Sequence, residues 1–332
     1  MIIAEIGQAH DGSLGQAHAF IDALAGTGVD AVKFQTHIAE AESSRYEPFR
    51  VKFSYQDATR FDYWKRMEFS FDQWSELKAH CEEKAMEFIS SPFSIQAVEL
   101  LEKLGVQRYK IGSGEVSNYL MLEKIAQTGK PIMLSSGMSS YAELDQSVGF
   151  LRNRGADISI LQCTTAYPTS PDLWGLNVIN ELSSRYNVPV GFSDHSGDIF
   201  ACLAAASLGA TIFEFHVVFD KRQFGPDSAS SLQVDDVAKL CEGIKQIQMA
   251  TQNPIDKNDN SKFSELKQIF EKSLSLNKSK RKGELILIED LEAKKPGDRG
   301  IPASNYASVV GKKAVRDIQQ WEFITSEMLS GN

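Results

Sequence analysis

The stretch VPVGFSDHSGDIFACLAAASLGATIFEFHV, residues 188–217, decides the fold. It opens with an apolar run of strand length, 188–193, and closes with another, 211–217. Between them, residues 198–210 have the length and apolar content of a helix and reach a glycine near their end, as helices commonly do. Two strands joined by a helix are the unit from which parallel α/β folds are built.

The same alternation fills the first 250 residues. Apolar runs of strand length occur at 2–7, 31–35, 87–91, 108–112, 131–136, 158–163, 188–193 and 211–217. Eight strand-then-helix units over about 250 residues predict an α/β fold of the (β/α)8, or TIM, barrel class. A doubly wound sheet is the alternative, but the segment after the first run, GQAHDGS, lacks the glycine spacing of a dinucleotide-binding loop.

The chain is predicted to divide into a barrel domain at 1–250, a linker at 251–271 and a small domain at 272–332. Within the barrel, residues 37–70 form a long, irregular and aromatic-rich connection. Connections of that length are usually functional or disordered. The aromatic content favours an ordered lid over the barrel mouth.

Composition argues against several classes of protein. The net charge of −9 argues against nucleic-acid binding. No apolar run approaches the roughly 18 residues of a membrane span, and the N-terminus lacks the pattern of a secretory signal. The four scattered cysteines predict free thiols in a reducing compartment. A cytoplasmic protein without membrane or nucleic-acid partners is expected.

Two lysines within apolar strands, Lys33 and Lys110, are predicted to point into the barrel. A buried ammonium group needs a carboxylate or an anionic ligand. One interpretation is an internal ion pair with Glu5 or Glu214. The other is a doubly anionic substrate, for which serines at neighbouring strand ends would add hydroxyl donors: Ser90, Ser91, Ser113, Ser135 and Ser136.

His195 and His216 lie at the ends of two consecutive strands, each beside a carboxylate, Asp194 or Glu214. Two imidazoles at such positions predict a divalent metal with open positions for water and substrate. Two protein ligands suit a weakly held ion better than structural zinc. The histidines at 18, 37 and 80 receive no role.

Nine motifs in order make the chain similar to the sialic acid synthase family, which includes N-acetylneuraminate, legionaminate and pseudaminate synthases. They are AEIGQAHDGS (4–13), VKFQT (32–36), SSPFS (90–94), YKIGSGE (109–115), LSSGM (134–138), CTTAYPT (163–169), GFSDHS (191–196), FEFHV (213–217) and GPDSASS (225–231). The tail, with KKPGDRGIP (294–302), resembles the small antifreeze-like (SAF, β-clip type) domain of this family.

The resemblance implies a transferase for surface-polysaccharide biosynthesis. It would condense phosphoenolpyruvate with an open-chain N-acetylated hexosamine and water, and release phosphate. N-acetylmannosamine and the 2,4-diacetamido-trideoxy hexoses are the acceptors that fit. The family also implies a Mn²⁺ or Mg²⁺ cofactor and a domain-swapped homodimer, in which each tail covers the partner's barrel mouth.

Carried over position by position, the resemblance implies a role for each candidate. The phosphoenolpyruvate site matches Lys33, Ser91, Lys110, Ser113 and Ser135. The sugar side matches Gln35, Phe93, Thr165, Tyr167 and Asp227, with Lys295 and Arg299 from the tail. The metal ligands match His195 and His216, and the catalytic groups match Glu5, Lys110, Glu214 and Asp227.

Three departures from the family pattern lie mainly on the sugar side. Thr165 stands where asparagine is frequent, and Ser228 where histidine is frequent. Lys295 replaces an arginine, and lysine cannot make the same bidentate contact; Arg299 is a candidate substitute.

Two other functions are compatible with the sequence. One is a phosphoenolpyruvate-dependent aldol-type synthase of seven- or eight-carbon acids, which needs a second phosphate site. The other is a catalytically idle sugar-binding or coat-assembly protein on the same scaffold.

Overall fold

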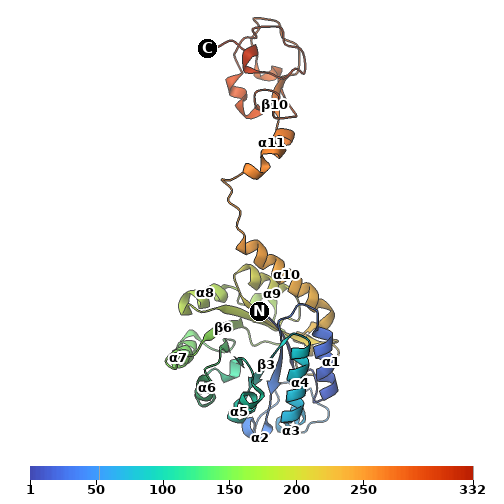
Figure 1. Cartoon of the computed structure of the whole chain (residues 1–332), viewed down its shortest axis with the longest axis vertical. Helices are drawn as coiled ribbons and strands as arrows, with labels where there is room; N and C mark the ends of the chain where they lie inside the picture. Colours follow the sequence, from blue (N-terminus) through green and yellow to red (C-terminus); the bar gives the residue numbers. More distant parts are fainter. Residues whose placement is uncertain (52, 332) are drawn as a thin grey trace. The chain divides into compact units, whose positions relative to one another are not determined.

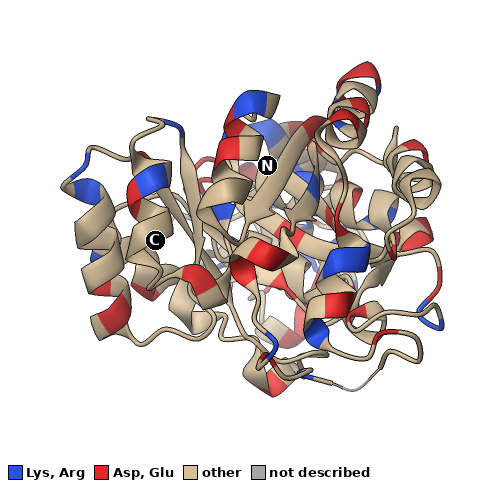
Figure 2. Cartoon of the chain, turned by 90° about the horizontal axis from the view of Figure 1, so that it is seen from below, with Lys and Arg blue, Asp and Glu red and all other residues tan. Residues whose placement is uncertain are grey.

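The computed structural model describes residues 1–51 and 53–331. The chain forms two compact units, Met1–Asn253 and Pro254–Asn332. Among the described residues, no helix is both long enough and apolar enough to cross a membrane. Acidic and basic side chains are interspersed over the helices of the first unit (Figure 2).

The first unit is a near-closed parallel barrel, which confirms the predicted fold class (Figure 1). The strands pair in the order β3-β2-β1-β8-β7-β6-β5-β4, and β3 lies beside β4. Their bounds are β1 Ile2–Gly7, β2 Ala31–Thr36, β3 Glu87–Pro92, β4 Tyr109–Ile111, β5 Ile132–Ser135, β6 Ile158–Cys163, β7 Val190–Asp194 and β8 Ile212–Val218. A two-residue strand, β9 (Leu232–Gln233), pairs with β8.

Helices surround the strands. They are α1 Leu14–Leu24, α4 Phe71–Glu83, α5 Ile95–Leu104, α6 Tyr119–Ala126, α7 Tyr141–Arg152, α8 Asn177–Tyr186, α9 Phe200–Ser207 and α10 Val234–Gln252. Side chains of Ser13, Ser94 and Ser140 cap the N-termini of α1, α5 and α7, because a hydroxyl oxygen can accept from an unpaired amide of the first turn. Both faces of the strands are buried, which explains their nearly continuous apolar sequences.

The lid segment 37–70 is more regular than the sequence predicts. It contains α2 (Ala39–Glu42) and α3 (Arg60–Met67). A reciprocal capping box between Thr59 and Asp62 starts α3. Buried Tyr63, Trp64 and Met67 pack with Ala39 in a small cluster of their own. The connection is therefore not irregular throughout as the sequence suggests, because the capped eight-residue helix α3 packs its buried side chains into this local core.

The second unit holds α11 (Ser264–Phe270) and the antiparallel strands β10 (Ser273–Leu276) and β11 (Leu291–Lys294). It has a separate core, built from Leu274, Leu276, Ile286, Val309, Ala314, Ile318, Ile324 and Leu329. Asp290 is fully buried and lies 2.7 Å from Lys278 Nζ and 2.5 Å from Lys280 Nζ. The antifreeze-like class of this unit stays a prediction.

Candidate active site

A cavity of about 360 Å³ opens at the carboxyl ends of the barrel strands. Barrel enzymes place their chemistry at this end. Its lining includes all the barrel residues to which the resemblance gives a role: Glu5, Lys33, Gln35, Ser91, Phe93, Lys110, Ser113, Ser135, Thr165, Tyr167, His195, Glu214, His216 and Asp227. The other two candidate serines are not in this lining, because Ser90 Oγ donates to the Phe34 carbonyl and Ser136 Oγ to the Leu161 carbonyl. Lys295 and Arg299 lie in the second unit.

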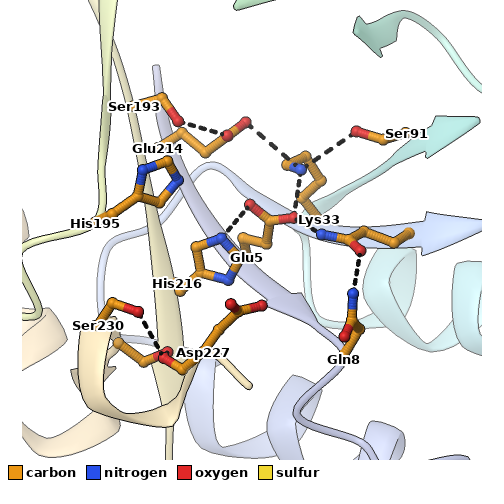
Figure 3. A network of polar contacts seen from close by, with 12 residues as sticks. Glu5, Gln8, Lys33, Ser91, Ser193, His195, Glu214, His216, Asp227 and Ser230 are labelled. Carbon is orange, nitrogen blue, oxygen red and sulfur yellow. Dashed lines mark hydrogen bonds and ion pairs between the residues drawn. The ribbon is translucent and has the colours of Figure 1, made fainter. Parts of the chain in front are cut away.

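Two buried ion pairs form the floor of the cavity. Lys33 Nζ lies 2.6 Å from Glu5 Oε1 and 3.8 Å from Glu214 Oε2 (Figure 3). Lys110 Nζ lies 2.9 Å from Glu214 Oε1. All four side chains are almost completely buried. The predicted internal ion pairs are therefore present. The same two lysines also line the cavity, so an anionic substrate could still contact them.

The lysines and the carboxylates of the floor stabilise each other's charged forms. Burial alone would raise the pKa of the Glu5 and Glu214 carboxyls, but nearby cations outweigh it and the pKa of each is lowered. Burial would lower the pKa of Lys110, but Glu214 and Glu5 outweigh it and this pKa is raised. The floor therefore carries two ammonium and two carboxylate groups at neutral pH.

Hydroxyl groups surround the floor. Lys33 Nζ lies 3.3 Å from Ser91 Oγ, and Ser193 Oγ donates to Glu214 Oε1 at 3.0 Å. Ser113 and Ser135 line the same end of the cavity. Ser193 received no role in the sequence analysis, although it lies within the quoted GFSDHS motif. Cations with neighbouring hydroxyl donors are suited to bind an anion with several oxygens.

The two candidate metal ligands face each other, with ring centroids 5.4 Å apart. His195 directly follows β7, and His216 lies in the neighbouring strand β8. His195 Nδ1 lies 3.0 Å from the Thr164 carbonyl oxygen, so Nδ1 is the protonated nitrogen and Nε2 keeps its lone pair. His216 Nε2 lies 3.2 Å from Glu5 Oε2. Among the described residues, no group of three or more His, Cys, Asp or Glu side chains has a metal-binding arrangement. The pair therefore fits an ion that takes most of its ligands from water and substrate.

Tyr167 and Asp227 connect the histidines to the lid. The Tyr167 ring is tilted against that of His195, with centroids 4.2 Å apart, and burial raises the pKa of Tyr167. The Arg50 guanidinium lies over the Tyr167 ring, 4.2 Å from its centroid, and donates to Asp227 Oδ1 at 2.6 Å. The lid segment therefore contributes a charged wall to the cavity.

A hydrogen-bonded chain leads from the floor to His37. Gln35 Nε2 donates to Glu5 Oε1 at 2.8 Å, which turns Gln35 Oε1 toward His37 Nε2, 3.1 Å away. His37 Nδ1 lies 2.6 Å from Glu42 Oε1. Both neighbours of the imidazole, the Glu42 carboxylate and Gln35 Oε1, are hydrogen-bond acceptors. Its ring is stacked between Trp64 and Phe93.

The sequence predicts a lid over the barrel mouth, but not which of its side chains line the cavity. His37, Glu42, Glu47, Arg50, Arg60 and Trp64 all line it. The available signal was the density of aromatic and charged residues in 37–70. That signal predicts a lid, but it cannot say which side chains turn inward, because the segment lacks a regular period.

A near-closed barrel with a polar, charge-paired cavity at its strand ends defines an enzyme of the (β/α)8 class. The chain belongs to the NeuB family, which matches residues 20–256. N,N'-diacetyllegionaminic acid synthase of Campylobacter jejuni is 34% identical, over 98% of this chain and 98% of the relative. Human N-acetylneuraminate-9-phosphate synthase is 31% identical, over 100% and 93%. The N-acetylneuraminic acid synthetase structure from Leptospira borgpetersenii has 29% identity and a TM-score of 0.71, over 80% of this chain and 89% of that one.

Proposed function

We propose that this chain is a nonulosonic acid synthase, a transferase that condenses phosphoenolpyruvate with an open-chain N-acetylated hexosamine and water. The observation that carries the proposal is the meeting, in one cavity, of two buried lysines with hydroxyl groups and a facing histidine pair. Its synthase relatives over nearly the whole chain support the same class.

The floor would hold the donor. Lys33 and Lys110, with Ser91, Ser113 and Ser135, supply cations and hydroxyl donors for the phosphate and carboxylate of phosphoenolpyruvate. Carbon 3 of the enol then forms a bond to the acceptor's aldehyde carbon. Water adds at carbon 2, and the bond from carbon 2 to the phosphate oxygen breaks, which releases inorganic phosphate.

His195 and His216 would hold a divalent cation, Mn²⁺ or Mg²⁺. Such an ion, when bound, polarises the aldehyde as a Lewis acid. The Thr164 carbonyl fixes the tautomer of His195 that this role requires.

Proton transfer would fall to the carboxylates. A carboxylate among Glu5, Glu214 and Asp227 would relay the proton that the attacking water loses to the alkoxide formed at the aldehyde carbon. Asp227, Gln35, Tyr167, Thr165 and Phe93 would face the sugar. Family resemblance alone supports a homodimer with exchanged tails and acceptor contacts from Lys295 and Arg299, and composition supports a cytoplasmic location.

Phosphate release from phosphoenolpyruvate with Mn²⁺ and a panel of acceptors tests the proposal. The panel holds N-acetylmannosamine, both 2,4-diacetamido-trideoxy hexoses and a pentose phosphate. Release with an N-acetylated sugar that is lost on chelation and in His195→Ala would support the proposal. Release with the pentose phosphate alone would assign the chain to the seven- and eight-carbon acid synthases. No release with any acceptor from folded, metal-supplemented protein would favour an idle sugar-binding scaffold.

A further inference from the structure

Arg60, the first residue of α3, turns its side chain toward the cavity. The side chain is 13% exposed, and its guanidinium lies 4.3 Å from the centroid of Trp64. It lines the same cavity as the candidate catalytic groups.

Arg60 has a buried hydrogen-bond donor without an acceptor. Its Nε has no hydrogen-bond partner among residues 1–51 and 53–331. The nearest carboxylate oxygen, Glu47 Oε1, lies 3.5 Å from Nε. Both Glu47 oxygens already accept from Trp64 Nε1, at 3.2 and 3.1 Å, and Oε2 also accepts from Ser43 Oγ. Burial lowers the pKa of Arg60.

Arg66, at the other end of the same helix, shows what a structural arginine looks like in this lid. It donates to both carboxylate oxygens of Asp57 and to the Asp11 side chain and carbonyl. A mostly buried guanidinium whose donors lack acceptors is unfavourable unless something else supplies them. For Arg60, the adjacent cavity is where such acceptors would come from.

The charges around Arg50 and Arg60 indicate whether a ligand group bound beside them would be anionic or neutral. Arg50 is paired with Asp227 at 2.6 Å, and Arg60 has Glu47 beside it. Each guanidinium therefore has a carboxylate that balances its charge, while the buried Nε of Arg60 remains without a hydrogen bond. A further anion here would also face the charges of Glu47 and Asp227. A neutral oxygen that only accepts hydrogen bonds, such as an amide carbonyl, matches both conditions.

We propose that Arg60, with Arg50 on the same wall, forms a subsite that donates hydrogen bonds to the carbonyl oxygen of an acylamino group on the acceptor sugar. This inference rests on the proposed function and names the feature by which the acceptor is selected. Acylamino acceptors are preferred over sugars with a hydroxyl in that place, and over acceptors that carry a phosphate.

The test compares Arg60→Met with Lys65→Met in the full-length protein. Lys65 lies on the same helix, is 52% exposed and pairs with Glu68, so its replacement removes one positive charge outside the cavity. Initial rates are measured with N-acetylmannosamine, its 6-phosphate, and mannose. Melting temperatures check that both variants fold.

Loss of a hydrogen bond to a charged donor predicts a rise of about 10- to 100-fold in the acceptor KM of Arg60→Met. The KM for phosphoenolpyruvate stays within about twofold, since Arg60 lies away from the floor lysines. With mannose, the substitution changes kcat/KM less than about threefold, because the acyl oxygen is missing. Lys65→Met behaves as wild type.

The outcomes separate the subsite from the proposed function. Wild-type turnover together with an unchanged acceptor KM in Arg60→Met overturns the subsite and leaves the synthase assignment intact. A preference for the phosphorylated acceptor that Arg60→Met abolishes overturns the neutral-oxygen assignment. If the wild type releases no phosphate, titration calorimetry with N-acetylmannosamine decides: binding weakened tenfold in Arg60→Met supports the subsite, and equal or absent binding overturns it.

Discussion

His37 is the partner of a buried carboxylate, although the sequence assigned it no role. Its Nδ1 lies 2.6 Å from Glu42 Oε1 and its Nε2 lies 3.1 Å from Gln35 Oε1. Removal of the imidazole therefore leaves a carboxylate that is only 7% exposed without its partner. His37→Ala is expected to lower the free energy of unfolding by about 3 kcal/mol, measured by urea denaturation.

His80 provides the matched control. Its Nε2 also pairs with a carboxylate, Asp22, but that carboxylate is 57% exposed. His80→Ala is expected to cost less than about 1 kcal/mol. Equal losses in the two variants would contradict a special role for the buried pair.

Replacement of Lys110 is expected to raise the KM for phosphoenolpyruvate, whereas replacement of Arg60 is expected to raise the KM for the acceptor. Its ammonium lies on the floor beside Glu214, where phosphoenolpyruvate is proposed to bind. Lys110→Met should raise the KM for phosphoenolpyruvate by at least about 100-fold, because a charge-assisted contact to an anion is lost. The acceptor KM should change far less. Steady-state kinetics with each substrate varied in turn would show the contrast, and a larger effect on the acceptor would contradict the assignment of the floor to the donor.

At the scale of elements, close approach of β7 and β8 positions the histidine pair. A Cβ on Gly191 would lie 2.6 Å from the Ile212 carbonyl oxygen and 2.7 Å from Ile212 Cβ, so any side chain there pushes the two strands apart. Gly191→Ala is expected to destabilise the barrel by about 1–3 kcal/mol. It should also weaken stimulation by Mn²⁺, since His195 directly follows β7 and His216 lies in β8.

Gly149 within α7 is the control for this substitution. A Cβ there meets nothing within 4 Å. Because alanine is the better helix former, Gly149→Ala should leave activity unchanged and stabilise the protein by about 0.5–1 kcal/mol. Thermal unfolding and Mn²⁺ titration of both variants provide the comparison; unaltered metal response in Gly191→Ala would show that strand spacing does not set the site.

The sequence predicts the bounds of the barrel strands, but it does not predict which side chains of the lid contact the barrel. Strands β1 and β6 have the bounds of the apolar runs 2–7 and 158–163, and the ends of the other six barrel strands lie within two residues of the predicted ones. Burial on both faces leaves each parallel strand a nearly unbroken apolar sequence. The lid is held instead by side-chain contacts between distant residues, such as Arg50 with Asp227, which no local pattern encodes. The barrel candidates could be predicted because strand ends meet at one edge, whereas Arg60 and His37 could not.

The whole molecule consists of two units with separate cores, so its unfolding is expected to show two transitions by calorimetry. Asp290 offers a way to identify the second. Burial would raise the pKa of this carboxyl, but the contacts with Lys278 and Lys280 outweigh it and lower the pKa from 3.8 to about 2. A lowered folded-state pKa means that its stabilisation is present above about pH 4 and is lost as the pH falls toward 2.

Asp290→Asn should therefore lower one melting transition by about 5 °C or more at pH 7 and leave the other in place. The difference from wild type should shrink between pH 4 and pH 2, because protonated aspartic acid and asparagine are alike in charge. Glu327→Gln, an exposed position in the same unit, removes the same charge and should shift neither transition. If Asp290→Asn shifted both transitions together, the two units would unfold as one cooperative body, and the tail would contribute to the stability of the barrel.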